Sequence, residues 1–207
     1  MVNRICWTKM IKVGITGGIG SGKTYVCKLL ELMNFSVFYS DAEAKKIQDT
    51  NAYVRSKLIE LFGEQAFTEN GLNRKYIAEI IFGNPTAKKQ LEEIIHPKVA
   101  EAFATWCEEK AGTDEKIVFI ESAILYESGF DKMVDKVIVV YADEDVRIER
   151  SMRRDGADRT AIEERIKNQG SDKEKCNKAD FVVHNNPNDY VNKQLLNIVK
   201  ELYYTED

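Results

Sequence analysis

The sequence lacks long apolar runs and an excess of positive charge, and it has few prolines. Its longest apolar run, near Val137–Ala142, is about six residues, whereas a membrane-spanning helix needs roughly 18. Lysine and arginine total 30 against 34 aspartates and glutamates, which gives a net charge of −4. A nucleic-acid or anionic-membrane binder typically carries a basic excess, so we expect neither partner. With 3 prolines and 12 glycines in 207 residues, collagen-like and low-complexity classes are excluded.

Cysteines are also few and far apart: Cys6, Cys27, Cys107 and Cys176. They form no CxxC pair and have no histidine nearby, so neither a disulfide framework nor a zinc site is indicated. We expect reduced thiols in a cytoplasmic protein. Residues 1–9 contain no apolar segment of signal-peptide length. We interpret them as an extension or as the product of a misassigned start, and we expect no function for them.

Short apolar segments alternate with helical patterns along much of the chain. The predicted strands are Ile11–Thr16, Ser36–Tyr39, Ile117–Ile120, Val137–Tyr141 and Phe181–Val183. Ile117–Ile120 and Val137–Tyr141 lack polar alternation, as expected for parallel strands covered on both faces. The alternation predicts an α/β fold with a parallel sheet. Without internal repeats or a Pro/Ser linker, we expect no independent second domain.

Helical patterns occupy most of the remaining sequence. One covers Gly22–Met33, and a second begins after Asp41, its expected N-cap. The others lie in Ala52–Gly112, Asp143–Lys178 and Tyr190–Tyr203. The Ala52–Gly112 block shows no strand pattern, and Asn70-Gly71 and Asn84-Pro85 mark turns within it. One apolar helix face in this block continues past Pro97. We therefore expect a helical insertion.

Residues 17–24, Gly-Gly-Ile-Gly-Ser-Gly-Lys-Thr, match the pattern GxxxxGK[ST] between a predicted strand and a predicted helix. We call them the phosphate loop. Glycines let the backbone N–H groups curl around a phosphate at the positive end of the helix. Lys23 would reach the β- and γ-phosphates, and Thr24 would bind Mg²⁺. Three classes fit this loop: a small-molecule phosphotransferase, a GTPase, and a nucleotide-dependent motor or binding module.

The sequence Asn177-Lys178-Ala179-Asp180 spells NKxD, which is typical of guanine recognition in GTPases. In GTPases that motif follows an apolar strand, whereas here a polar stretch precedes it and the strand comes afterwards. The chain also has no DxxG, which argues against a GTPase. Motor ATPases normally need more residues than this chain has.

Two carboxylates follow predicted strands, where ligands of a doubly wound sheet bind. Asp41 lies after the second strand and is a candidate base for an acceptor hydroxyl, since a kinase needs a group that takes up that proton. It is alternatively a plain N-cap. Glu121 follows Ile117–Ile120 and is a candidate Mg²⁺ ligand, or alternatively an incidental acid at a strand end.

Six of the nine arginines lie within one stretch: Arg147, Arg150, Arg153, Arg154, Arg159 and Arg165. Arg147, Arg150 and Arg154 share one helix face by their spacing. The guanidinium fork suits phosphoryl oxygens, which favours a lid that closes over the nucleotide. Acidic residues interleave with them, so each arginine singly is also compatible with a salt-bridged surface.

These residues resemble the dephospho-CoA kinase family, relatives of the nucleoside monophosphate kinases, from about Ile11 to Asn186. Besides the phosphate loop, Tyr39-Ser40-Asp41 is similar to the family's Asp-Ala-Asp, with its second aspartate kept. Gly71–Arg74 resembles Gly-x-Leu-Asp-Arg, and Leu91–Pro97 resembles Leu-Glu-x-Ile-x-His-Pro.

The similarity continues through the second half of the chain. Ala123–Glu127 is a looser form of Pro-Leu-Leu-Phe-Glu, and Glu149-Arg150 with Arg154-Asp155 match the family's lid helix. Gln169 and Ala179–Asn185 match its C-terminal pattern. This sequence departs from the family at four positions: Tyr39, Lys45, Ala123 and Arg147, the last standing where glutamine is usual.

The resemblance implies phosphorylation of the ribose 3′-hydroxyl of dephospho-CoA by MgATP, which gives CoA and ADP in the last step of CoA biosynthesis. It implies a single three-layer P-loop NTPase domain with a five-stranded parallel sheet. The expected core is residues 10–50, 113–142 and 179–207, the CoA-binding helical insertion is 51–112, and the lid is 143–178. The alternatives are a nucleoside monophosphate or other small-metabolite kinase and a non-catalytic nucleotide-binding module. We make no prediction of the oligomeric state.

The resemblance also assigns roles to residues. The expected catalytic residues are Asp41, Lys23, Arg150 and Arg154. The expected ATP-binding residues are Gly17, Gly18, Gly20, Ser21, Gly22, Lys23, Thr24, Tyr25 and Asn185. The expected acceptor-binding residues are Asp41, Arg74, His96, Leu125, Tyr126 and Glu127. Thr24 and Glu121 are expected to hold Mg²⁺.

Overall fold

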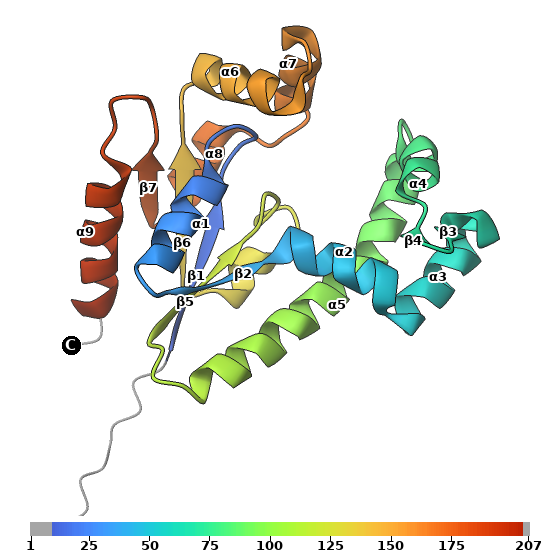
Figure 1. Ribbon diagram of the computed structural model, residues 1–207, viewed down its shortest axis with the longest axis horizontal. Coiled ribbons are helices and arrows are strands. Elements are labelled where there is room, and N and C mark those ends of the chain that lie inside the picture. The colour runs from blue at the N-terminus through green and yellow to red at the C-terminus, as the bar shows by residue number, and fades with distance from the viewer. Residues whose placement is uncertain (1–9, 205–207) are drawn as a thin grey trace, which may run out of the picture. The chain divides into compact units, whose positions relative to one another are not determined.

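The computed structural model describes residues 10–204 and divides the chain into two compact units. Unit 1 holds the residues up to Phe38 and from Lys110 onward, and unit 2 is Tyr39–Glu109. A five-stranded sheet has the order β2-β5-β1-β6-β7 (Figure 1). Its strands are β1 (Ile11–Thr16), β2 (Ser36–Tyr39), β5 (Ile117–Glu121), β6 (Lys136–Tyr141) and β7 (Phe181–His184). The sheet is parallel and confirms the α/β prediction.

The strands of this sheet form the centre of the unit 1 core. Every residue of β5 is buried, and so is the middle of β6. This burial explains why neither segment alternates between polar and apolar residues. Helices α1 (Lys23–Leu32) and α9 (Val191–Tyr204) contact each other beside the sheet (Figure 1). Val26 and Leu30 of α1 and Leu195 of α9 are fully buried.

The register of the strands brings several candidate site residues to one edge of the sheet. Ile15 of β1 pairs with Glu121, the last residue of β5, and Thr16 pairs with Val139 of β6. Tyr141 of β6 pairs with His184 of β7. Because these strands are parallel, the phosphate loop after β1, Glu121, and Asn185 after β7 all lie at their carboxyl ends.

Between β6 and β7 the chain forms α6 (Glu144–Asp155), α7 (Arg159–Lys167) and α8 (Asp172–Lys178). Helices α6 and α7 contact each other, and α8 contacts β6. Two ion pairs join α6 to α7. Arg159 Nη2 lies 2.6 Å from Asp145 Oδ1, and Arg165 Nη1 lies 2.9 Å from Asp155 Oδ2.

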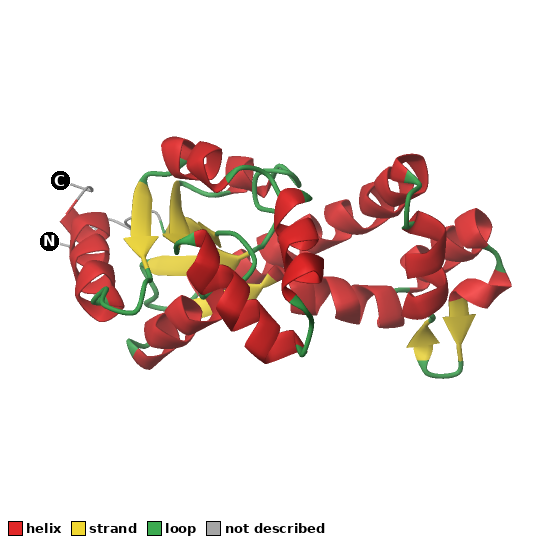
Figure 2. Cartoon of the chain, turned by 90° about the horizontal axis from the view of Figure 1, so that it is seen from above, coloured by secondary structure: helices red, strands yellow, loops and turns green. Residues whose placement is uncertain are grey.

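Unit 2 is mostly helical, but the prediction that the block has no strand was wrong. Its helices are α2 (Ser40–Thr50), α3 (Ala52–Phe62), α4 (Arg74–Ile81) and α5 (Pro85–Ala111), the last running into unit 1, with a 3₁₀ turn η1 (Glu64–Ala66). The antiparallel strands β3 (Phe67–Thr68) and β4 (Gly71–Leu72) form a small hairpin, seen in Figure 2 as the isolated pair of short strands. Its strands are too short to show an alternating pattern. The only sequence signal of the hairpin was the predicted turn at Asn70-Gly71, where Gly71 has a φ angle of 103°.

Helix boundaries follow local chemistry, with one correction. Asp41 is not the N-cap of α2, because the helix begins at Ser40 and Tyr39 occupies the cap position. Asp41 lies in the first turn, where a negative charge is favourable at the helix N-terminus. Pro97 lies inside the continuous helix α5, as the apolar face predicted. The division into core, insertion and lid stays a prediction, and residues 1–9 lie outside the described residues.

No helix among residues 10–204 is long and apolar enough to cross a membrane.

Asp180, the last residue of the NKxD match, has a structural role directly before β7. Its carboxylate accepts a hydrogen bond from Val137 N at 2.8 Å and one from Lys136 Nζ at 3.0 Å. Its own N–H donates to Val137 O at 3.0 Å. This geometry agrees with the rejection of a guanine-binding role.

Replacing Asp180 by alanine should lower the free energy of unfolding by about 1–3 kcal/mol, because the Val137 N–H then loses its acceptor. Urea unfolding followed by circular dichroism measures the change. Asp114→Ala, which changes an exposed aspartate in the loop before β5, is the matched control and should stay within about 0.5 kcal/mol of the original chain. Equal stability of both variants would contradict the assignment.

Candidate active site

The phosphate loop joins β1 to α1 in the geometry that the motif requires. Gly20 and Gly22 have φ angles of 76° and 96°, and Gly22 is the N-cap of α1. The Ser21 N–H donates to Gly18 O at 3.1 Å, which closes a turn within the loop. The N–H groups at the start of α1 and the helix dipole favour an anion at this end. The loop therefore fits a phosphate group.

Lys23 lies across the loop that precedes it. Its ammonium Nζ donates to Gly17 O at 2.8 Å and lies 3.5 Å from Gly18 O. Thr24 follows in the first turn of α1 and is exposed. The Lys23 ammonium thus lies beside the carbonyls of Gly17 and Gly18, at the end of the helix that carries positive potential.

Glycine is required at Gly20 and Gly22 because other segments approach the backbone there. A Cβ on Gly20 would lie 2.3 Å from the carbonyl oxygen of Arg147 in α6. A Cβ on Gly22 would lie 2.1 Å from Nδ2 of Asn185. Since both residues also have left-handed φ angles, any side chain there would displace either the loop or its neighbours.

A pocket of about 430 Å³ opens beside the loop. Its lining residues come from the loop, α1, α6, the segment after β7 and the start of α9: Gly22, Tyr25, Arg150, Asn185, Asn186, Pro187, Asp189 and Val191. Asn185 is buried, and its Nδ2 donates to Ser21 O at 2.8 Å while its N–H donates to Tyr141 O at 2.8 Å. Arg150 Nη1 is buried without a hydrogen-bond partner among the described residues. Such a buried donor is suited to an oxygen of a ligand in this pocket.

Sequence reasoning found Gly22, Tyr25, Arg150 and Asn185 but missed the remaining pocket residues. Asn186 N donates to Asp189 Oδ2 at 2.7 Å, and Asn186 Oδ1 accepts from Asp143 N at 2.9 Å. These bonds fix the turn that forms one wall. The cluster Asn-Asn-Pro-Asn-Asp at residues 185–189 is a turn signal directly after a strand, so it could have been placed at the ligand-binding edge of the sheet.

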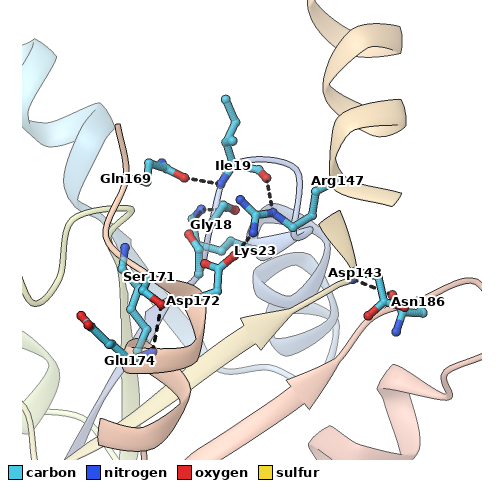
Figure 3. Close-up of polar contacts among 12 residues, drawn as sticks. Gly18, Ile19, Lys23, Asp143, Arg147, Gln169, Ser171, Asp172, Glu174 and Asn186 are labelled. Atoms are coloured by element: carbon cyan, nitrogen blue, oxygen red, sulfur yellow. Dashed lines mark hydrogen bonds and ion pairs between the residues drawn. The ribbon is translucent and has the colours of Figure 1, made fainter. Parts of the chain in front are cut away.

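The tip of the loop is held by residues from the α6–α8 region (Figure 3). Arg147 Nε donates to Ile19 O at 2.9 Å, and Ile19 N donates to Gln169 Oε1 at 2.7 Å. Arg147 is 4% exposed and forms an ion pair with Asp172. Burial lowers the pKa of Arg147, and Glu144 opposes that change; a guanidinium nevertheless stays charged at neutral pH. Gln169 entered the sequence prediction only through the family pattern, and Asp172 was missed.

The other arginines of this region pair with carboxylates at the surface. Arg153 lies 2.7 Å from Glu149, and Arg159 lies 2.7 Å from Glu163. Arg154 Nε lies 2.7 Å from Asp155 Oδ1, and hydrogen bonding to that carboxylate raises the pKa of Arg154. Arg150 thus lies in the pocket, whereas Arg154, predicted to act beside it, binds a neighbouring acid.

The two predicted metal ligands lie on different elements of unit 1. Glu121 is 8% exposed and ends β5 beside Ile15, whereas Thr24 lies in α1. Burial raises the pKa of the Cys27 thiol in α1, and the charge of Glu121 raises it further while that of Lys23 lowers it. Within residues 10–204 no group of three or more His, Cys, Asp or Glu residues is arranged to hold a metal ion.

The segment Leu125–Glu127, predicted to contact the acceptor, packs against the core and α8. Leu125 is 0% exposed and lies against Gly14, so its predicted contact has no exposed surface to support it. Burial, and to a smaller extent the charge of Asp131, raises the pKa of Tyr126 to about 12. Glu127 lies 2.9 Å from the buried Lys175 Nζ. Burial alone would raise the pKa of Glu127, but its interactions, chiefly with Lys175, outweigh burial and hold that pKa below its usual value.

Three predicted site residues lie in unit 2. Asp41 is exposed in the first turn of α2. Arg74 Nη2 lies 2.7 Å from Asp49 Oδ2, and this hydrogen bond lowers the pKa of Asp49. His96 lies in α5, where burial lowers its pKa against the opposing charge of Glu92. The neutral form of the His96 imidazole is therefore favoured.

Comparison with known proteins points to one family. The family model described as dephospho-CoA kinase matches residues 11–190. The chain is 44% identical over 193 residues to a dephospho-CoA kinase of Bacteroides fragilis strain YCH46, which covers 93% of each protein.

Two solved structures are similar in fold and in sequence. One is a Thermus thermophilus protein with a TM-score of 0.81 and 30% identity, covering 93% of this chain and 97% of that one. The other is the dephospho-CoA kinase of Campylobacter jejuni, with a TM-score of 0.69 and 28% identity, covering 95% and 98%. The likeness extends over nearly the full length of both proteins.

Replacing Gly22 by alanine should weaken binding of a nucleoside triphosphate by at least about tenfold, or ~1.4 kcal/mol. The new Cβ meets Asn185 Nδ2 at 2.1 Å and forces apart the loop and the wall of the pocket. Isothermal titration with ADP and with ATP measures the dissociation constants.

Gly156→Ala is the matched control, since Gly156 also has a positive φ, 63°, but a Cβ there meets nothing within 4 Å. It should lower stability slightly through backbone strain and leave nucleotide binding unchanged. Unaltered nucleotide affinity in Gly22→Ala would mean that the loop does not hold the phosphates.

Proposed function

This chain belongs to the dephospho-CoA kinase family, and from that premise we propose that it transfers the γ-phosphoryl group of ATP to the ribose 3′-hydroxyl of dephospho-CoA. The products are CoA and ADP, and the reaction is the last step of CoA biosynthesis. The observation that carries this proposal is the phosphate loop with the pocket beside it, lined by Gly22, Arg150 and Asn185. The family similarity, which covers residues 11–190, supplies the acceptor.

The loop and the pocket divide the binding of ATP between them. The N–H groups at the start of α1 and the Lys23 ammonium bind the β- and γ-phosphates. The pocket takes the nucleoside, where Tyr25 is half-exposed and Asn185 is fixed by two hydrogen bonds. The buried Nη1 of Arg150 donates to an oxygen of the bound nucleotide.

Thr24 and Glu121 fit Mg²⁺ by the chemistry of their donor atoms. Mg²⁺ prefers oxygen ligands and usually binds through one or two protein groups together with phosphates and water. A hydroxyl and a carboxylate supply such oxygens, and a cage of three protein ligands is not needed. The ion, when bound, stabilises negative charge on the phosphate oxygens.

Asp41 is the proposed base of the reaction, by its match to the second aspartate of the family motif. Its carboxylate takes the proton of the 3′-hydroxyl as that oxygen forms a bond to the γ-phosphorus, and the bond from the γ-phosphorus to the bridging oxygen of ADP breaks. Lys23 and Arg150 stabilise the charge on the transferred group. Arg154 is proposed to stabilise the same charge, after its ion pair with Asp155 has broken.

Unit 2 carries two further proposed acceptor residues, Arg74 and His96. A guanidinium suits the phosphate groups of dephospho-CoA, and a neutral imidazole both donates and accepts hydrogen bonds. Tyr126 and Glu127 in unit 1 complete the set proposed from the family pattern. These roles would make the acceptor a large, anionic nucleotide rather than a small sugar or acid.

We also propose that the protein acts in the cytoplasm and binds no nucleic acid. Cys27 and Cys176 are free thiols, which suits a reducing compartment. The net charge of −4 gives no general attraction to polyanions, and the local cations around the loop serve a small nucleotide instead.

The reaction predicts ADP release from MgATP that depends on dephospho-CoA. Coupled ADP detection with dephospho-CoA, AMP, CMP or shikimate as acceptor compares the candidate substrates directly, and chromatography identifies CoA as the product. We expect turnover with dephospho-CoA to exceed that with each other acceptor by at least about 10²-fold. Absence of ADP release with dephospho-CoA would remove the proposed function.

Asp41→Asn should lower kcat by about 10²- to 10⁴-fold, because the amide cannot accept the hydroxyl proton. The KM for ATP should change little, since Asp41 has no role in the phosphate loop. Steady-state kinetics with both substrates separates the two effects.

Glu43→Gln is the matched control on the same helix, since it also converts a carboxylate into an amide. Glu43 pairs with Lys46 at 3.1 Å on the surface, so its kcat should equal that of the original chain. Turnover of Asp41→Asn close to the original value would exclude Asp41 as the base.

A further inference from the structure

Ile19, at the tip of the phosphate loop, is held through both of its backbone groups. Its carbonyl accepts from Arg147 Nε at 2.9 Å, and its N–H donates to Gln169 Oε1 at 2.7 Å. The two partners come from different segments, α6 and the stretch before α8 (Figure 3). A short glycine-rich loop has many accessible backbone conformations, so these two bonds select one of them.

Arg147 cannot easily exchange this contact for another. It is 4% exposed, and its guanidinium binds Asp172 through Nη1 while Nε binds Ile19. A buried guanidinium without a counter-ion is strongly unfavourable, so Asp172 fixes its orientation. Asp172 is itself the first residue of α8, which links that helix to the loop.

The same pair limits the space on the outer side of the loop. A Cβ on Gly18 would lie 2.5 Å from Arg147 Nη2 and 2.8 Å from Asp172 Oδ1. The backbone of Arg147 lies equally close to Gly20, with its carbonyl oxygen 2.3 Å from the position of a Cβ there. The pair therefore supports the loop from Gly18 to Gly20.

We propose that Arg147, oriented by Asp172, is a positioning residue that holds the phosphate loop in its nucleotide-binding conformation before ATP arrives. It acts through the Ile19 carbonyl and not on the transferred phosphoryl group. The Arg147–Asp172 pair thus shapes the loop through the Ile19 carbonyl.

The proposal rests on the proposed function in that ATP is the nucleotide, and it is tested on the full-length enzyme with dephospho-CoA as acceptor. Arg147→Gln should raise the KM for ATP and the dissociation constant for ADP roughly tenfold, as expected if the competent loop is then populated about a tenth of the time. The kcat at saturating ATP should stay within about twofold, because the bound nucleotide restores the loop.

Two further variants separate positioning from charge. Arg147→Lys keeps the charge but lacks the fork that reaches Ile19 and Asp172 together, so it should not restore the KM for ATP. Asp172→Asn should also raise this KM, by less than Arg147→Gln does, because the bond to Ile19 remains while its orientation is lost. Combining Arg147→Gln with Asp172→Asn should raise the KM no further than Arg147→Gln alone, since the pair acts as one unit.

Arg153→Gln is the matched control. It makes the same substitution on the same helix, but its pair with Glu149 is exposed and does not reach the loop. Its KM, kcat and melting temperature should equal those of the original chain.

Each contrary result is distinct. A lower KM for ATP in Asp172→Asn, or rescue by Arg147→Lys, would show that Arg147 acts by its charge alone. A loss of kcat at unchanged KM in Arg147→Gln would place it on the reacting group. A lower melting temperature with unchanged nucleotide affinity would leave it a purely structural residue. If the original chain binds ADP but does not phosphorylate dephospho-CoA, the proposed function fails. The dissociation constants of the variants for ADP still test the positioning role in that case.

Discussion

The site depends on the close approach of α6 and Asn185 to the backbone of the phosphate loop. At Gly20 and Gly22 the neighbouring atoms leave no room for a Cβ, so the loop is packed on its outer side as tightly as a protein core. The loop leads into α1, where the N–H groups at the start of the helix and the helix dipole favour an anion. The tight packing of the loop and the positive end of this helix together form a fixed site for an anion.

This arrangement explains how a mildly acidic chain can bind a highly anionic nucleotide. The net charge of −4 spreads over the whole surface and is screened within about 10 Å in salt. The donors at the site act at contact distance: the helix N-terminus, Lys23, and the buried Nη1 of Arg150. Local geometry therefore decides the affinity for phosphate, and the total charge has little influence on it.

The sequence predicted the parts that depend on local patterns. All five strands of the sheet and the phosphate loop follow from apolar runs and one motif, and the parallel arrangement follows from the absence of polar alternation. Other features needed tertiary information. The hairpin β3–β4 has too few residues for a period, and Leu125 is buried and lies against Gly14 of a distant segment. Asp172 meets Arg147 across 25 positions of sequence, and no spacing rule links such residues.

The arginines between residues 147 and 165 show why helix spacing alone could not assign their roles. Arg147, Arg150 and Arg154 share one face by periodicity, yet Arg154 binds Asp155 at the surface, where an ion pair contributes at most about 1 kcal/mol. Arg147 is buried, and removing its partner there would leave an uncompensated charge at a much larger cost. Arg150 is the one of the three that presents a buried donor without a partner among the described residues. Burial and the identity of the partner, which only the folded chain defines, therefore divide one sequence cluster into a surface pair, a support for the loop and a ligand-facing group.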